Sequence, residues 1–244
     1  MTRGNWRTYA AELLGTFTLV FIGTTAIVAA GRANAPVLLV AAFAFGLALL
    51  AGLYAFAEVS GGHFNPAVSL ALFLDRRLPP GDLIGYWIAQ FAGAIFASIV
   101  LLIATNKSDV ASTATVPSSD GTAFLIEFVM TTLFVLVILQ ASRSERFGPS
   151  ALVAIPLTLL AAHLAAIPFS GSSLNPARTF GPDLIGNVWT GLWIYLIAPP
   201  LGALLAWLIH ATVVTGTLGP VAPPVAEVLE EPVGDERARR RRRR

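Results

Sequence analysis

The chain has 244 residues, of which 55% are hydrophobic and only 12% are charged, and its formal net charge at pH 7 is +2. Because soluble domains carry about 25% charged residues, this composition excludes an ordinary soluble domain and indicates a membrane protein with several spans. The sequence contains no cysteine, which excludes disulfide bonds, thiolate metal sites and a cysteine nucleophile.

Six apolar segments, taken in chain order, are long enough to cross a hydrocarbon core of ~30 Å. The predicted spans are Tyr9–Ala30, Val37–Ala57, Leu83–Ala104, Ala123–Ala141, Ser150–Phe169 and Trp189–Val213. The longest polar connection, Thr105–Asp120, is predicted to be a loop. We therefore expect one membrane domain over residues 1–214. It is followed by a disordered cytoplasmic tail over residues 215–244, which is rich in proline and acidic residues and ends in a polyarginine run.

One tripeptide, Asn-Pro-Ala, occurs twice, each time between two predicted spans. The copies are Asn65-Pro66-Ala67 and Asn175-Pro176-Ala177. Asparagine is a preferred N-cap and proline is favoured at the first helical position, so each copy indicates a helix start. The first helix has room only from Pro66 to Leu74, roughly 14 Å, which is about half of the hydrocarbon core. The pattern thus predicts two half-helices that enter the membrane without crossing it.

The distribution of lysine and arginine predicts the orientation, because cytoplasmic loops carry the excess of these residues. With the N-terminus inside, the cytoplasmic side carries most of them and the other side carries Arg32, Lys107 and Arg178. We therefore predict a multi-pass protein of the cell membrane with both termini in the cytoplasm. The first half-helix then enters from the cytoplasm and the second from outside, so their N-termini face each other near the midplane. The cytoplasmic set is Arg3, Arg7, Arg76, Arg77, Arg143, Arg146 and the arginines of the tail.

The two halves of the chain repeat. Glu12 lies early in the first span and Glu127 early in the fourth, and each is followed by a threonine four residues later. The order of span, span, half-helix and span then recurs over residues of about 8–104 and 121–214. An odd number of spans in each half inverts the second half relative to the first. The fold class predicted is an all-α membrane protein with six transmembrane helices, two re-entrant half-helices and an inverted repeat.

Irregular polar backbone precedes each half-helix, and such backbone is tolerated at membrane depth only where protein covers it or where it lines an aqueous cavity. We expect its carbonyl groups to line a narrow pore, together with the amide groups of the two asparagines. Both helix N-termini would present about +0.5 elementary charge at the midplane. This arrangement favours a neutral molecule with lone pairs and disfavours a cation. The predicted pore-lining residues of these loops are Gly61, Gly62, His63, Gly171 and Ser173.

These motifs resemble the paired signatures of the aquaporin, or major intrinsic protein, family. The resemblance covers the chain from about Tyr9 to Val213, and it includes the segments Ala11–Phe17 and Gly85–Gln90 besides the two Asn-Pro-Ala motifs. It implies a passive channel for water, and for small neutral solutes in some members, that is neither an enzyme nor dependent on a cofactor or metal. It also implies a homotetramer in a lipid bilayer with no nucleic-acid partner.

The resemblance implies a selectivity filter at Phe45, His163, Ser172 and Arg178. Phenylalanine, histidine and arginine together resemble the water-selective set, in which the ring side chains narrow the opening. The resemblance also favours a structural role for Glu12 and Glu127, which would hold the irregular loops in place. The alternative for these acids is proton transfer or ion coordination. His63 is expected in the inner vestibule, and His210 at the membrane interface.

Several positions depart from the family patterns. Glu58 replaces a common histidine. Thr179 stands where glycerol channels typically have an aspartate, which supports water as the permeating molecule. Asp183 is unusual for a water channel, and the pair Tyr195-Leu196 matches neither subgroup. The sequence therefore leaves two alternatives open. One is a facilitator of glycerol, urea, ammonia or metalloid hydroxides. The other is a secondary active transporter that couples through Glu12, Glu58 or Glu127. The polyarginine run would either bind anionic lipid or remain solvated on the cytoplasmic side.

Overall fold

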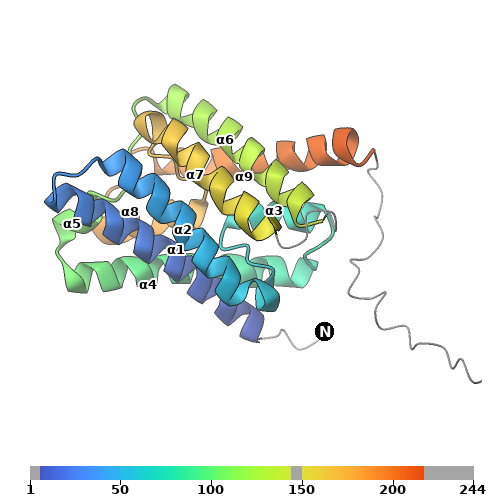
Figure 1. Ribbon diagram of the computed structural model, residues 1–244, viewed down its shortest axis with the longest axis horizontal. Helices are drawn as coiled ribbons and strands as arrows, with labels where there is room; N and C mark the ends of the chain where they lie inside the picture. Colours follow the sequence, from blue (N-terminus) through green and yellow to red (C-terminus); the bar gives the residue numbers. More distant parts are fainter. Residues whose placement is uncertain (1–5, 144–149, 217–244) are drawn as a thin grey trace, which may run out of the picture.

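The computed structural model describes residues 6–143 and 150–216, and its long helices form a single bundle (Figure 1). Six helices are long and apolar enough to cross a membrane, and they confirm the six predicted spans. The last of them continues as a π-helical turn, η2 (His210–Val214). The six are α1 (Trp6–Arg32), α2 (Val37–Ser60), α4 (Pro80–Ala104), α6 (Asp120–Ala141), α7 (Ala151–Ser170) and α9 (Leu192–Ile209).

Two shorter helices begin at the Asn-Pro-Ala motifs, as predicted. These are α3 (Pro66–Leu74), with 9 residues, and α8 (Pro176–Gly186), with 11 residues. Each half-helix packs mainly against a long helix of the other repeat, α3 against α9 and α8 against α4. This exchange joins the two halves of the chain into one bundle.

A glycine in the left-handed conformation caps the C-terminus of the long helix before each half-helix. α2 ends at Gly61 and α7 at Gly171, with φ angles of 86° and 73°. Glycine adopts this left-handed conformation without a steric penalty, so it stops the helix and turns the chain inwards. Three residues later, Phe64 and Leu174 also have positive φ angles, 49° and 55°. Such a conformation is strained for a residue with a side chain and must be held by its surroundings.

The polar connection between α4 and α6 is more ordered than the predicted loop. It contains a short helix, α5 (Lys107–Ala111), whose N-cap Asn106 accepts a hydrogen bond from the Asp109 amide. Arg32 at the end of α1 pairs with Asp109 at 2.6 Å. Beyond α5 the chain turns into the bundle and buries the side chains of Thr113 and Thr115. The prediction of a plain loop was therefore wrong, because local polarity concealed these tertiary contacts.

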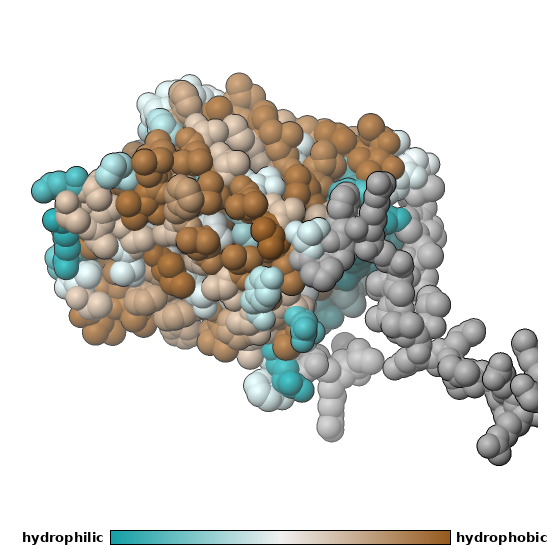
Figure 2. Space-filling view, in the orientation of Figure 1, coloured by the Kyte–Doolittle hydropathy of each residue, from teal (hydrophilic) through white to brown (hydrophobic). Residues whose placement is uncertain are grey.

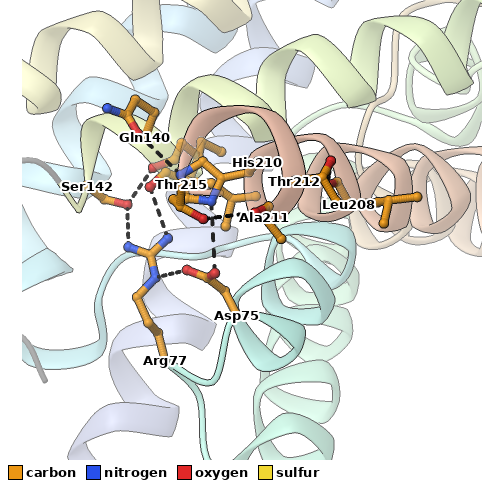
Figure 3. Close-up of polar contacts among 11 residues, drawn as sticks. Asp75, Arg77, Gln140, Ser142, Leu208, His210, Ala211, Thr212 and Thr215 are labelled. Carbon is orange, nitrogen blue, oxygen red and sulfur yellow. Dashed lines mark hydrogen bonds and ion pairs between the residues drawn. The ribbon is translucent and has the colours of Figure 1, made fainter. Parts of the chain in front are cut away.

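A polar cluster ties the end of α3 to the ends of α6 and α9 (Figure 3). Arg77 contacts Asp75 at 2.9 Å and donates hydrogen bonds to Ser142 at 3.0 Å and to the Leu139 carbonyl at 3.3 Å. His210 lies in the same cluster, fully buried, with its Nε2 atom 3.2 Å from Oε1 of Gln140. The sequence analysis placed His210 at the membrane interface, and the structure adds that its side chain is buried against a partner from α6 that sequence position does not reveal.

The outer surface of the bundle is largely apolar, and hydrophilic residues gather towards its two ends (Figure 2). Large apolar side chains on this surface are well exposed, for example Tyr54 at 65% and Ile88 at 66%. A surface of this kind suits contact with lipid rather than with water. The polyarginine tail lies outside the described residues.

Candidate functional site

Two cavities lie between the half-helices and the surrounding long helices, and they share Leu49, His63 and Phe134, so they adjoin one another. The one beside the two motif asparagines has a volume of about 20 Å³, and the other of about 50 Å³. The smaller cavity, called the outer cavity after the predicted orientation, is also lined by Leu19, Phe45, Asn65, Leu159, His163, Ser173, Asn175 and Arg178. The larger, inner cavity is also lined by Leu53, Gly61, Gly62, Val68, Leu72, Ile138, Ser142 and Ile155.

The two asparagines meet at the N-termini of α3 and α8. Asn65 Oδ1 accepts a hydrogen bond from the Ala67 amide, and Asn175 Oδ1 accepts from the Ala177 and Arg178 amides. Each asparagine side chain also donates a hydrogen bond to the loop that precedes the half-helix of the other repeat. Asn65 Nδ2 donates to the Leu174 carbonyl at 2.8 Å, and Asn175 Nδ2 donates to the Phe64 carbonyl at 2.9 Å. These cross-links fix both amide groups beside the cavity, each with a second N–H to offer. The remaining motif residues, Pro66, Ala67, Pro176 and Ala177, are buried in the first turns of the half-helices.

Glu12 and Glu127 hold the strained loops by the same set of contacts. Glu127 accepts hydrogen bonds from the Ser170 hydroxyl and from the Ser173 and Leu174 amides, each at 2.7 Å. Glu12 accepts the matching bonds from Ser60, His63 and Phe64 at 2.6–3.0 Å. The left-handed Phe64 and Leu174 thus each donate an amide N–H to a buried carboxylate. Bonds to a charged acceptor are strong, which explains how the positive φ angles persist.

A pair of tyrosines supports the same loops, and the sequence reasoning missed it. The Tyr86 hydroxyl donates to the Ser60 carbonyl and the Tyr195 hydroxyl to the Ser170 carbonyl, both at 2.6 Å. The recurrence of Ser-Gly before each half-helix was a signal that Ser60 and Ser170 play equivalent parts. Gln90 breaks the symmetry, because its Nε2 atom contacts both Glu12 and Ser69 at 2.8 Å. Ser69 in turn holds His63 Nδ1 at 3.0 Å.

Phe45, His163 and Arg178 come together at the outer cavity from three different helices. The rings of Phe45 and His163 meet edge to face, with 5.1 Å between their centroids. The Arg178 guanidinium lies 4.7 Å from the centre of the Phe45 ring. All three side chains are at most 4% exposed. The Arg178 Nη1 atom donates to the Thr113 carbonyl at 3.5 Å. The connection between α4 and α6, to which Thr113 belongs, therefore contributes directly to this constriction.

The other predicted loop residues surround the constriction. Ser172 Oγ lies 3.1 Å from His163 Nδ1 and so fixes the imidazole ring. The opposite nitrogen, His163 Nε2, and the Nε atom of Arg178 have no partner among the described residues. Ser173 lines the outer cavity, whereas Gly171 lies against Thr115. The constriction therefore offers polar nitrogen atoms from one side and the apolar Phe45 ring from the other.

A bundle of six spans, with two half-helices whose N-termini meet at a narrow polar pathway, defines an aquaporin-like membrane channel. The aquaglyceroporin from Plasmodium falciparum has the same fold, with a TM-score of 0.77 and 24% identity over 86% of this chain and 96% of its own. Within residues 6–143 and 150–216, no three histidine or acidic side chains come together as a metal site.

The sequence comparisons identify the family. The family model for major intrinsic proteins matches residues 1–210. "Glycerol uptake facilitator protein-like 6" of Lactiplantibacillus plantarum is 41% identical over 209 residues, which cover 82% of this chain and 94% of that protein. Aquaporin Z of Brucella melitensis is 39% identical over 215 residues, with coverage of 82% and 94%. The chain therefore belongs to the major intrinsic protein family, whose members are passive membrane channels and not enzymes.

Proposed function

We propose that the chain conducts water down osmotic gradients and excludes protons, ions and larger neutral solutes. The observation that carries this proposal is the constriction formed by Phe45, His163 and Arg178, with Ser172 behind the imidazole ring. The outer cavity has a volume of about 20 Å³. A water molecule needs about 10–15 Å³ on this measure, so this cavity has room for about one water molecule, and we expect a three-carbon solute to be excluded.

The exclusion of protons and cations follows from the charges along the pathway. The N-termini of α3 and α8 each contribute about +0.5 elementary charge at the asparagines. Asn65 and Asn175 present N–H groups to the lone pairs of a passing molecule, and Arg178 adds a full positive charge further out. A neutral acceptor is stabilised at these points, whereas a hydronium ion is repelled.

A facilitator of small neutral solutes is the second candidate. It is supported by the name of the 41% identical relative, a glycerol uptake facilitator-like protein, and by the departures at Asp183 and Leu196. In contrast, the name of the 39% identical relative, Aquaporin Z, supports the water channel. The size and polarity of the constriction decide our preference for water.

Stopped-flow light scattering of proteoliposomes separates the two candidates. Vesicles that contain the protein are challenged first with an impermeant osmolyte and then with glycerol. We expect faster shrinkage than in protein-free vesicles and no acceleration of the re-swelling that follows glycerol influx. Rapid glycerol re-swelling would favour the solute facilitator, and slow shrinkage in both conditions would contradict the channel function.

A widened variant tests the position of the filter. Replacement of both His163→Gly and Arg178→Val removes the two side chains that oppose the Phe45 ring. We expect glycerol re-swelling to appear in this variant while water conduction persists. If glycerol stays excluded, these residues do not form the selective constriction.

We also propose that both termini lie in the cytoplasm and that the protein is a homotetramer.

A further inference from the structure

Asp183 is a buried acid that the proposed conduction of water does not explain. It lies on α8, five residues after Arg178, which corresponds to about 7.5 Å along the helix axis. Its side chain is fully buried, and neither carboxylate oxygen has a hydrogen-bond partner within the described residues. A buried charge without close partners is costly, so its presence beside a constriction calls for a functional reason.

Asp183 and Arg178 act on each other electrostatically. Of the nearby acids, Asp183 exerts the strongest attraction on the Arg178 guanidinium, and Glu127 follows. Glu127 already accepts three hydrogen bonds from the loop before α8. The connection between α4 and α6 lies close to both residues, because the Thr113 carbonyl accepts from Arg178 and the Thr115 hydroxyl donates to Thr179 on the same helix. Of these two acids, Asp183 is therefore the one whose carboxylate has no hydrogen bonds to other groups among the described residues and can act mainly on Arg178.

A lone arginine at the narrowest point of a pore would attract anions as well as repel cations. The apolar walls of Phe45, Leu19 and Leu159 provide little screening at this point. A second, negative charge near the guanidinium lowers this attraction, and it leaves the N–H groups available to water. It does so without lining the outer cavity itself, because Asp183 is not among the lining residues.

We infer that Asp183 is the counter-charge of Arg178 and that it lowers the permeation of small inorganic anions through the constriction. The inference rests on the proposed channel function and deepens it, because it assigns a residue that determines selectivity against anions. Asp183 touches no permeating molecule and acts through the field at Arg178. Asp183 therefore acts electrostatically through Arg178 and is not itself part of the selectivity filter.

The experiment compares chloride influx and water permeability in the same proteoliposomes at pH 8.5, with chloride followed by an entrapped chloride-quenched dye. The variant Asp183→Asn removes the charge with almost no change in shape. We expect chloride influx to rise about tenfold and water permeability to change by less than about twofold, because the lost charge acts on an anion but not on a neutral molecule. Equal chloride influx in the variant and the wild type would overturn the inference.

Two control proteins separate this effect from others. Asp109→Asn removes one negative charge at the same end of the bundle. Because Asp109 pairs with Arg32 and not with Arg178, this variant should leave chloride influx unchanged. In an Arg178→Val background the fixed positive charge that attracts chloride is gone, so chloride influx in the double variant Arg178→Val/Asp183→Asn should stay below that in Asp183→Asn alone. If Asp183→Asn does not fold, Asp183→Ser provides a second neutral variant. Wild-type vesicles that conduct no water would instead contradict the proposed function.

The pH dependence of chloride influx tests the charge of Asp183, because a purely structural role of this residue would give no such dependence. Burial raises the pKa of Asp183 to about 7, and the charge of Arg178 opposes this shift. The counter-charge is then present above pH 7 and lost below it, so chloride influx in the wild type should rise as the pH falls from 8.5 to 5.5. The other groups that act on this region are Glu127, Tyr195 and His163. These remain in Asp183→Asn, so the difference between the two pH profiles reports Asp183 alone. Parallel profiles would contradict the inference.

Discussion

At the scale of single residues, the position of the Phe45 ring depends on the absence of a side chain at Gly23. A methyl group at Gly23 would overlap three atoms of that ring. Because the same ring contacts His163 and Arg178, a displaced ring alters the constriction that these three side chains form. A residue that no motif indicates thus sets the width of the outer cavity.

We therefore expect Gly23→Ala to lower water permeability, and also to lower the free energy of unfolding by about 1–3 kcal/mol, the usual cost of overpacking a close-packed site. The measurement is osmotic shrinkage of proteoliposomes at equal protein content. Gly31→Ala is the matched control on the same helix, because a methyl group at Gly31 would meet nothing within 4 Å. Unchanged permeability in Gly23→Ala would show that the ring finds room elsewhere.

At the scale of elements, each half-helix is aimed by a loop that a buried carboxylate holds. Replacement of Glu127→Gln keeps the shape but substitutes an N–H donor for one acceptor oxygen. At least one of the Ser173 and Leu174 amides then loses its partner. An unsatisfied buried donor costs about 1–3 kcal/mol, so the temperature of thermal unfolding in detergent should fall.

Water permeability of Glu127→Gln should fall as well, because the same loop carries Asn175. Glu12→Gln should behave alike, since it holds His63 and Phe64 by the matching bonds. The exposed Glu58→Gln serves as the control and should unfold at the wild-type temperature. If both buried variants retained full stability but lost permeability, proton transfer rather than loop support would become the better role for these acids.

The cluster around Arg77 connects elements at the cytoplasmic end of the proposed topology. Arg77→Ala removes its contacts with Asp75, Ser142 and the Leu139 carbonyl, and it leaves the end of α6 uncapped. We expect a loss of about 1–3 kcal/mol in the free energy of unfolding, seen as a lower unfolding temperature in detergent. The neighbouring Arg76 is exposed, so Arg76→Ala should have a smaller effect. Equal effects of both substitutions would contradict a specific role for the cluster.

At the scale of the whole molecule, the proposed orientation is open to a direct test, because the natural sequence contains no cysteine. Single cysteines introduced at the exposed positions of Lys107 and Arg76 lie beyond opposite ends of the spans. An impermeant maleimide should label Lys107→Cys in intact cells. It should label Arg76→Cys only after the membrane is opened. The reverse pattern would invert the topology.

The proposed homotetramer is a further property of the whole molecule. The resemblance of the sequence to the aquaporin family motivates it, and the apolar outer surface is compatible with contact between copies. Native mass spectrometry from detergent should give a mass near four times the 25.7 kDa of one chain. A monomer as the dominant species in mild detergent would contradict the proposal.

The sequence predicted the spans and the starts of the half-helices well because these depend on local chemistry. Apolar length defines a span, and an asparagine followed by proline defines a helix start wherever the chain then folds. The predictions were incomplete where a partner distant in sequence decided the outcome. His210 is buried because Gln140 is there to meet it, and the connection after α4 is ordered by contacts with α1 and α8.

The sequence by itself therefore determined the membrane class, the six spans, the two half-helices and their inverted repetition. Only the tertiary structure decided how these parts act on one another. It showed that each asparagine donates to the opposite loop, that Gly23 leaves room for Phe45, and that Asp183 lies buried near Arg178. The physical reason is that hydropathy and capping act over one or two helical turns. Hydrogen bonds and close packing join residues from different elements, and the two asparagines reach partners 109 and 111 positions away.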